Sequence, residues 1–392
     1  MKKSSFNKNE IKKIWKLCEK TRIEGKIDRT SDEFLNCEKI LSDKKIKIKE
    51  KDLPGIIKEI KNKKITRLNE EKIVEVLDKF LNYFEIRGKK ISYFCPIYNL
   101  DSNIGEMNIN EKIKMRKIQS WELKYLKELY KNFTPIRVQI SKIEYVLIIT
   151  VSIDSDKSIS DDAKDLREKI LNQFRLCRSG EIRFGGLYEY DQDSDWNPDR
   201  IVHRIEYDKV GAFSLKKFQL NKRESKQFVT LINQIDKQND VFYRVIRRFS
   251  ETRDKKHDSD KITDYVMCME ALLVNSKTEV GYQFALFASL LIGGDGKMRK
   301  KNNEKLARYY GIRSTMVHDL DVSKEVRKMS PQIVIEVERF ARIVFLKMIL
   351  ISLEKEFEDL EYKQLVKKVE ESIFDEKLKE KFDKFDSIIN LI

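Results

Sequence analysis

Apolar residues recur at helical spacing along the first part of the chain. One stripe comprises Phe6, Ile11, Ile14, Trp15, Leu17 and Cys18, and a second comprises Ile73, Val76, Leu77, Phe80, Leu81 and Phe84. Spacings of three and four residues place side chains on one face of an α-helix, so we predict short helices within residues 1–85. Between the stripes, residues 44–64 alternate charged residues with isoleucine around a Pro-Gly break, which fits a strand as well as an exposed helix.

The pattern changes near residue 86. β-Branched and aromatic residues dominate residues 91–98 and 145–151, and residues 135–140 alternate in polarity, as strands do. A helical pattern covers residues 161–177, and the glycine-containing run 182–190 fits a strand or a hairpin. We therefore predict an α+β middle domain over residues 86–215.

From about residue 220 almost every segment has helical periodicity. The predicted helices cover residues 221–235 with Asn221 as N-cap, 241–250, 262–274, 281–292 and 303–319, and a long one opens at Ser330-Pro331. The charged run 251–261 is expected to be a loop, and Gly293-Gly294 a strong helix stop. The chain is thus predicted to be α+β: a basic helical region at 1–85, the mixed middle domain, and an all-α bundle at 216–392.

Composition restricts the class of protein. With 41% hydrophobic and 37% charged residues the chain can build a core and a well-solvated surface. The longest nearly uncharged apolar stretch, Tyr282–Ile292, is shorter than the roughly 20 residues of a membrane span, and the N-terminal residues lack the apolar core of a signal peptide. The five scattered cysteines include no CxxC pair, which argues against a zinc cluster. We expect reduced thiols, no cofactor, no membrane association and a cytoplasmic location.

The positive charge is concentrated near the N-terminus. The formal net charge is +15, and residues 1–70 hold 21 Lys or Arg against 12 Asp or Glu, a difference of +9. A basic region of this kind can bind phosphates by releasing counterions. A genome-wide bias toward lysine, isoleucine and asparagine would explain the same count, so the charge supports a nucleic-acid partner only where a site points the same way.

Arg313 and His318 are the strongest candidates for chemistry. An arginine grips phosphate oxygens with its planar fork and stabilises charge that develops on phosphorus, and a histidine exchanges protons near neutral pH. RNA supplies its own nucleophile, the 2′-hydroxyl. On a helix the two residues stand about 140° apart, close enough to flank one phosphate only at a helix end or an interface. Because the C-terminal helical region offers one obvious histidine, two copies of the pair facing each other across a dimer interface would supply both a base and an acid. A histidine beside Met316 and Val317 is also compatible with a structural role, so spacing alone does not decide.

Residues 269–319 carry a family resemblance. Glu270-Ala271-Leu272-Leu273, the apolar run from Tyr282 to Gly293, and Tyr310-Gly311-Ile312-Arg313-Ser314 followed by Val317-His318 resemble the successive motifs of the Apea-like HEPN domain. Looser likeness extends over residues 90–360, and the first 85 residues match nothing recognised. The resemblance implies a helical bundle that dimerises with its motifs at the interface, and a metal-independent ribonuclease of antiviral defence, abortive infection or toxin systems.

The resemblance also implies roles for single residues. Arg313 and His318 become the catalytic pair, Ser314 takes the polar place after the arginine, and Glu270 is an acidic residue that could orient Arg313. Asp319 departs from the usual glycine and places a carboxylate beside the histidine, where it would raise the histidine pKa or weaken RNA binding.

The expected partners are RNA, a second copy of the chain and an unidentified defence-system component. Two other readings stay open. One is a catalytically silent HEPN module that acts as an RNA-binding or dimerising adaptor. The presence of Asp319 in place of the usual glycine is compatible with this alternative. The other is a DNA-directed defence factor whose basic N-terminal region binds duplex.

Overall fold

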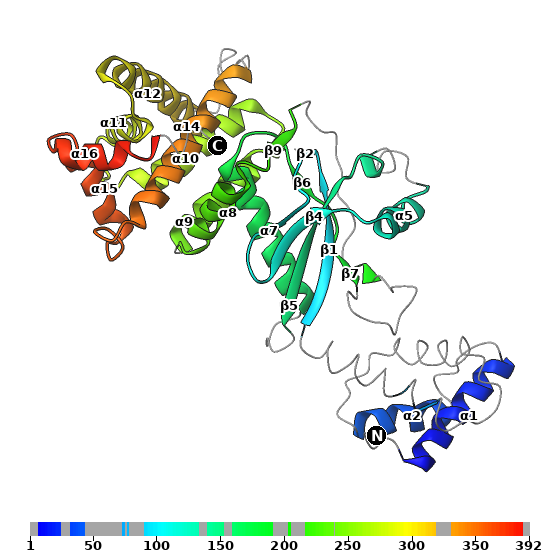
Figure 1. Cartoon of the computed structure of the whole chain (residues 1–392). Helices are drawn as coiled ribbons and strands as arrows, with labels where there is room; N and C mark the ends of the chain where they lie inside the picture. Colours follow the sequence, from blue (N-terminus) through cyan, green and yellow to red (C-terminus); the bar gives the residue numbers. More distant parts are fainter. Residues whose placement is uncertain are drawn as a thin grey trace. The chain divides into compact units, whose positions relative to one another are not determined.

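The computed structural model describes residues 7–24, 32–43, 73–74, 77, 90–132, 139–152, 159–190, 203–204, 216–238, 240–318 and 331–386 (Figure 1). The chain divides into two compact units. The first comprises Met1–Phe94, Thr150–Ala163 and Leu187–Glu206, and the second comprises Cys95–Ile149, Lys164–Gly186 and Tyr207–Ile392. The mixture of helices with a central, mainly antiparallel sheet and a helical C-terminal part confirms the predicted α+β class.

In the first unit, helices α1 (Lys8–Glu24) and α2 (Asp32–Asp43) pack against each other. Cys37 Sγ donates a hydrogen bond to the carbonyl of Lys13 at 3.8 Å, and Lys20 forms an ion pair with Glu33 at 2.9 Å. The described members of the two predicted stripes are buried, as the helical spacing requires: Ile11, Ile14, Trp15, Leu17, Ile73 and Leu77. Phe6, the side chain of Cys18, Phe80 and residues 44–64 lie outside the described residues.

The predicted strands at residues 91–98 and 145–151 are confirmed as β1 (Lys90–Tyr98) and β5 (Tyr145–Ser152). They lie inside a sheet of strand order β3-β4-β5-β1-β7-β8. The outer strands on one side are β3 (Glu106–Asn108) and β4 (Ile113–Lys117), and β4 pairs antiparallel with β5 so that Ile113 faces Ile149. Long runs of buried side chains on β1 and β5 explain why these two central strands have the clearest sequence signal.

The run 182–190 forms two short strands, β6 (Arg183–Phe184) and β7 (Tyr188–Tyr190). Both pair antiparallel with β1 rather than with each other, so the hairpin alternative is wrong. The N–H of Gly185 donates to the carbonyl of Pro96 at 2.8 Å, which keeps the chain beside β1 between the two strands. β7 also pairs antiparallel with β8 (His203–Arg204).

The remaining predictions for the middle region concern a strand at residues 135–140 and a helix at residues 161–177. The predicted strand 135–140 ends in helical backbone at Gln139 and Ile140, and residues 133–138 lie outside the described part. Helix α5 (Ser120–Leu129) precedes it, and α7 (Ile159–Cys177) confirms the predicted helix at 161–177. A second, two-stranded sheet joins β2 (Leu100–Ser102) and β9 (Phe218–Leu220) in parallel, a pairing that no local pattern predicted.

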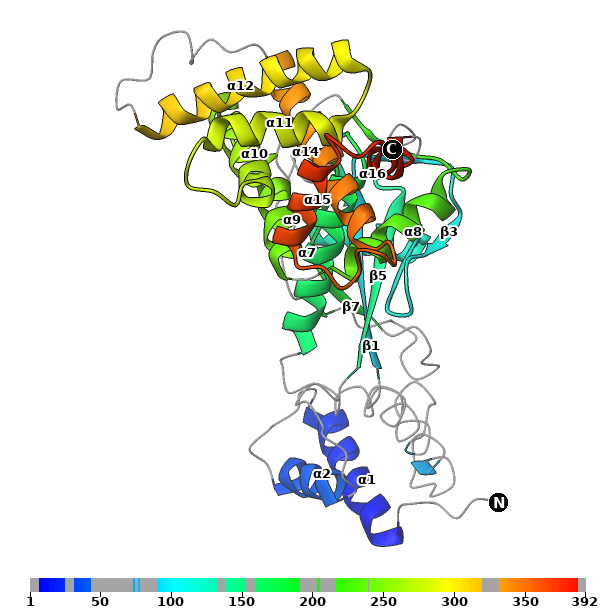
Figure 2. The same cartoon turned by 90° about the vertical axis from the view of Figure 1, so that its left-hand side faces the viewer.

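The helical region of the second unit follows the predicted periodicity closely. Its helices are α8 (Ser225–Asp236), α9 (Asp240–Thr252), α10 (Asp258–Leu273), α11 (Val280–Ile292), α12 (Gly296–His318), α14 (Pro331–Ser352), α15 (Tyr362–Glu371) and α16 (Glu376–Asp383). α14 packs on α8, α10 and α11, so the residues from Val344 to Ile351 are buried around its whole circumference. In Figure 2, α10, α11 and α12 lie side by side, in agreement with their contacts.

The helix ends differ in detail from the prediction. The charged run 251–261 is only partly a loop, because α9 extends to Thr252 and α10 already begins at Asp258. Asn221 Oδ1 accepts a hydrogen bond from the N–H of Glu224 at 3.0 Å, so it caps the turn that leads into α8. α11 ends at Ile292, and Gly293 is its C-cap with a φ of 80°. The predicted glycine stop after this helix is therefore confirmed. Ser330 lies outside the described residues, and Pro331 is the first residue of α14.

The structure describes the side chains of four cysteines, and all four are buried thiols: Cys37, Cys95, Cys177 and Cys268. Burial raises the pKa of Cys37 and of Cys268 to about 12 each. Burial also raises the pKa of Cys177. Cys37, Cys177 and Cys268 therefore stay protonated at neutral pH in the folded chain, which makes them poor nucleophiles.

Candidate active site

Helices α10 and α12 bring together two side chains that are 43 residues apart in sequence. Arg313 Nη2 donates a hydrogen bond to Glu270 Oε1 at 3.3 Å and lies 3.2 Å from Glu270 Oε2. The Arg313 side chain is 15% exposed and that of Glu270 is 22% exposed. A carboxylate at this distance fixes the direction of the guanidinium while leaving part of it accessible to solvent.

Aromatic residues complete the surroundings of Arg313. Its guanidinium carbon lies 5.7 Å from the centre of the Tyr310 ring, and the Tyr310 ring lies 5.6 Å from that of Phe284 on α11. Gly281 makes this packing possible, because a Cβ there would meet the Tyr310 ring at 2.8 Å. Burial raises the pKa of Tyr310, and the Glu270 carboxylate raises it further, so the phenol stays neutral beside the arginine.

The ion pair leaves much of the guanidinium unused. An arginine has five N–H donors in a fixed fork, and only one hydrogen bond from Arg313 is made to a described side chain. Arg313 Nε is buried and has no hydrogen-bond acceptor within the described residues. Such an arginine can bind a phosphate oxygen, either in place of its contact with Glu270 or together with it.

The other predicted site residues lie at the end of the same helix. α12 continues through His318, so positions 313 and 318 are about 140° apart around its axis. Ser314, next to Arg313, is half-buried. The side chain of His318 and the whole of Asp319 lie outside the described residues. The structure thus brings Arg313 and Glu270 together, places Ser314 next to Arg313 in the sequence of α12, and has α12 extend to His318.

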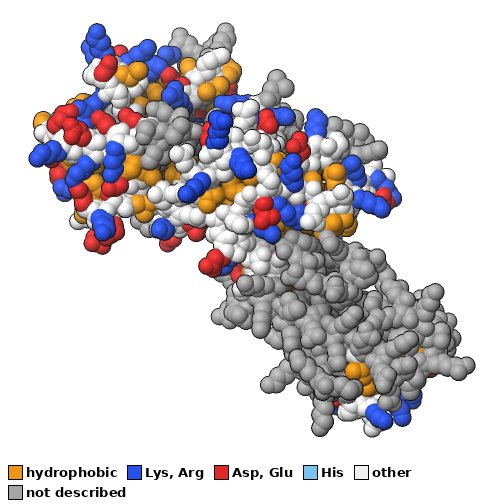
Figure 3. Space-filling view, viewed as in Figure 1, with side chains coloured by type: hydrophobic (Ala, Val, Ile, Leu, Met, Phe, Trp, Pro, Cys, Tyr) orange, Lys and Arg blue, Asp and Glu red, His pale blue; other side chains and the backbone are white. Residues whose placement is uncertain are grey.

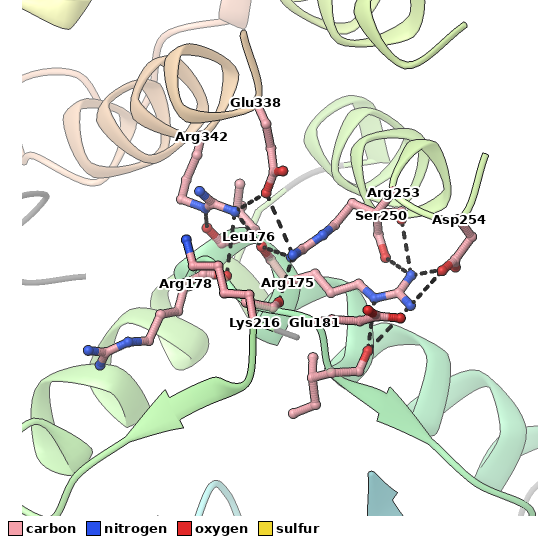
Figure 4. Close-up of polar contacts among 12 residues, drawn as sticks. Arg175, Leu176, Arg178, Glu181, Lys216, Ser250, Arg253, Asp254, Glu338 and Arg342 are labelled. Atoms are coloured by element: carbon pink, nitrogen blue, oxygen red, sulfur yellow. Dashed lines mark hydrogen bonds and ion pairs between the residues drawn. The ribbon is translucent and has the colours of Figure 1, made fainter. Parts of the chain in front are cut away.

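A second polar cluster, which no pattern in the sequence predicted, connects α7 with α9 and α14 (Figure 4). Arg342 Nε donates to the carbonyl of Leu176 at 3.0 Å, and Arg342 Nη2 donates to Glu338 at 2.6 Å. Arg253 Nη2 donates to the carbonyl of Gly180 at 2.6 Å, and Arg175 is paired with Asp254 at 2.8 Å. The acceptors of these guanidinium groups lie on α7, on α14 and in the segments that follow α7 and α9. The cluster therefore holds these parts of the fold together, and we call it the Arg342 joint.

The charge state of this joint follows from its contacts. Burial acts to raise the pKa of Glu338, but the guanidinium groups of Arg253 and Arg342 outweigh it and hold the pKa of that carboxyl below its ordinary value. Glu338 is therefore ionised at neutral pH and balances two of the arginines.

A separate open cavity of about 220 Å³ lies among α7, α8 and α9. Lys169 and Asp236 form an ion pair at its lining, and Gln173 is buried there. None of its lining residues belongs to the Arg313–Glu270 site.

The described residues contain neither a candidate metal site nor a helix that could span a membrane. No group of three or more His, Cys, Asp or Glu side chains in the described ranges is arranged to hold a metal ion. Among the helices that the structure describes, none combines the length and the apolarity needed to cross a bilayer.

Comparison with protein-family models, with curated proteins and with solved structures finds no match to this chain.

Proposed function

We propose that the chain is a metal-independent endoribonuclease of the HEPN type, acting as a homodimer in antiviral defence or abortive infection. The observation that carries the proposal is the ion pair between Arg313 and Glu270. Arg313 lies on α12, the helix that ends at His318, and Glu270 lies on α10. A carboxylate that orients an arginine while leaving most of its N–H donors unused is the arrangement that phosphate recognition needs.

The proposed reaction is an internal transesterification of RNA. A base accepts the proton of a 2′-hydroxyl, and the resulting oxygen forms a bond to the adjacent phosphorus. The bond from phosphorus to the 5′-oxygen breaks, and an acid donates a proton to that leaving oxygen. The products are a 2′,3′-cyclic phosphate and a 5′-hydroxyl end. Arg313 would stabilise the negative charge that develops on the phosphoryl oxygens.

His318 would provide the proton transfers, because imidazole exchanges protons near neutral pH. Positions 313 and 318 are about 140° apart on α12, so one copy does not direct both side chains to one phosphate. Two copies with their α12 ends together would place an arginine and a histidine from different chains on the same phosphodiester. Ser314 would add a polar group beside the arginine.

The test is cleavage of single-stranded RNA by the purified full chain in EDTA. We expect cyclic-phosphate ends from the wild type and a loss of at least about a hundredfold in Arg313→Ala and in His318→Ala. The matched controls are Arg339→Ala, an exposed arginine of α14, and His257→Ala, an exposed histidine before α10. Both controls should retain activity.

Two results would contradict the proposal. Cleavage that depends on added magnesium would refute the mechanism, and full activity in His318→Ala would refute the site. RNA binding without any cleavage would instead favour the silent adaptor, in which the Glu270–Arg313 pair serves only to join α10 and α12.

A further inference from the structure

The helix α12 carries a local excess of positive charge. Residues Gly296–His318 contain seven Lys or Arg and one acidic residue, Glu304, a difference of +6. Helices α15 and α16 together contain six Lys against five Asp or Glu, a difference of +1. The excess on α12 is therefore a property of this helix rather than of the bundle as a whole.

Three of the seven basic residues are used inside the fold. Lys305 pairs with Glu336, Arg313 pairs with Glu270, and Arg299 donates to the carbonyl of Gly294 at 2.7 Å. The other four are exposed and make no hydrogen bond or ion pair within the part of the chain that the structure describes. These four form what we call the basic face of α12: Lys297, Lys300, Lys301 and Arg308.

Helical geometry places the basic face in line with the candidate site. At about 100° per residue, its four members fall within a sector of about 100°, and position 318 falls in the same sector. Position 313 lies on the opposite side, toward α10. From position 297 to position 318 the face extends over about 31 Å at 1.5 Å per residue. In Figure 3, Lys and Arg side chains lie over the part of the molecule where Figure 1 draws α12.

We propose that the basic face of α12 binds the sugar–phosphate backbone of single-stranded RNA and directs the strand toward position 318. This inference rests on the proposed ribonuclease function for the identity of the strand that is bound. Lysine and arginine without internal partners can neutralise phosphates and release their counterions, which drives binding independently of base sequence. Glu304 is the single opposing charge in the sector.

The composition of the face favours a nucleic acid over a protein partner. The other residues in its sector are Glu304, Gly311, Thr315 and His318, so no large apolar side chain contributes to it. Protein interfaces take their stability from apolar and aromatic side chains at the centre. One row of charges on a single helix also matches one strand better than the two strands of a duplex.

The experiment measures binding separately from cleavage. The probe is a fluorescent 2′-O-methylated single-stranded RNA, which has no free 2′-hydroxyl and cannot be cut, titrated by anisotropy with the full chain at several salt concentrations. The test variant is K297Q/K300Q/K301Q/R308Q. The matched control is K355Q/K363Q/K367Q/K377Q, which removes the same charge from four exposed lysines elsewhere in the bundle. Thermal unfolding should be unchanged in both, since all eight residues are exposed.

We expect the test variant to bind more than about tenfold more weakly at 0.1 M salt, and its slope of log K against log salt to fall by about 3. The control should keep the wild-type slope. Equal losses in both variants, or none in either, would overturn the proposal. The assignment to single-stranded RNA would also be overturned if the chain bound duplex DNA more tightly than the RNA probe and the test variant lost that binding to the same extent. If the face is required for binding but no RNA is ever cut, the ribonuclease proposal fails while the binding surface stands.

Discussion

At the scale of single residues, the orientation of Arg313 depends on a side chain from another helix. The contact to Glu270 spans 43 residues of sequence, so no local spacing could have predicted it; only the family resemblance pointed to an acidic residue on that helix. The arginine, the histidine and the serine stand together in one short run and were visible to sequence reasoning. The joint around Arg342 was not, because its acceptors are mostly backbone carbonyls, which every residue has.

Replacing Glu270 tests whether it positions Arg313. In Glu270→Gln the ion pair becomes a neutral contact, and we expect kcat for RNA cleavage to fall roughly tenfold to a hundredfold with little change in KM. The free energy of unfolding should change by less than about 1 kcal/mol, because the pair is partly solvated. Steady-state kinetics and urea unfolding measure the two effects. A purely structural role would lower stability and leave kcat of the folded fraction unchanged.

Glu338 predicts a pH dependence of stability. Its folded pKa is lower than the ordinary value of 4.5, so its contribution is present above that value and is lost as the pH falls through the folded pKa. Glu338→Gln should cost about 3–5 kcal/mol at pH 7, because Arg342 is left without its buried carboxylate. Urea unfolding at pH 7 and pH 3 should show the gap between wild type and variant narrowing in acid. A gap of equal size at both pH values would contradict this account.

At the scale of elements, sequence pattern predicted what is locally determined. Helices such as α9 and α14 were predicted because each buries one continuous set of side chains, for example Phe242, Val245 and Ile246. The pairing of β9 with β2 was not predictable, because it joins residues more than a hundred positions apart. The early start of α10 at Asp258 was missed because acidic residues favour a helix N-terminus as well as a loop.

The end of α11 can be tested at one glycine. Gly293 has φ 80° and ψ −160°, and a Cβ there would lie 3.1 Å from Asp386 and 3.3 Å from the buried ammonium of Lys347. We expect Gly293→Ala to lower the free energy of unfolding by about 1–3 kcal/mol, because only glycine adopts this backbone conformation without strain. Gly296→Ala, where a Cβ would meet nothing within 4 Å, is the matched control and should be nearly neutral. Equal effects of the two changes would contradict the argument.

At the scale of the whole molecule, the proposed activity needs a second copy. Several apolar side chains of the helical bundle are exposed, among them Tyr282 at 65%, Val317 at 48% and Ile335 at 61%. Val317 immediately precedes His318 at the end of α12. An apolar residue beside the candidate site is what an interface around that site would bury.

Val317→Glu should therefore separate the dimer. A carboxylate buried at an interface without a partner costs several kcal/mol, so the dissociation constant should rise at least about a hundredfold and RNA cleavage should fall with it. Light scattering over a concentration series measures the mass. Phe374→Glu, at a 91% exposed side chain between α15 and α16, is the matched control. Wild-type protein that is monomeric at micromolar concentration and fully active would contradict the two-chain site.

The buried thiols can report how often the structure around them opens. A maleimide or iodoacetamide reagent attacks only an ionised, accessible sulfur, so each described cysteine must first be exposed by an excursion of the backbone around it. Cys37 reports such excursions in the first unit, and Cys177 and Cys268 report them in the second. Peptide mass spectrometry during timed alkylation would then read the opening rate of each unit separately, in a single sample and without any engineered probe.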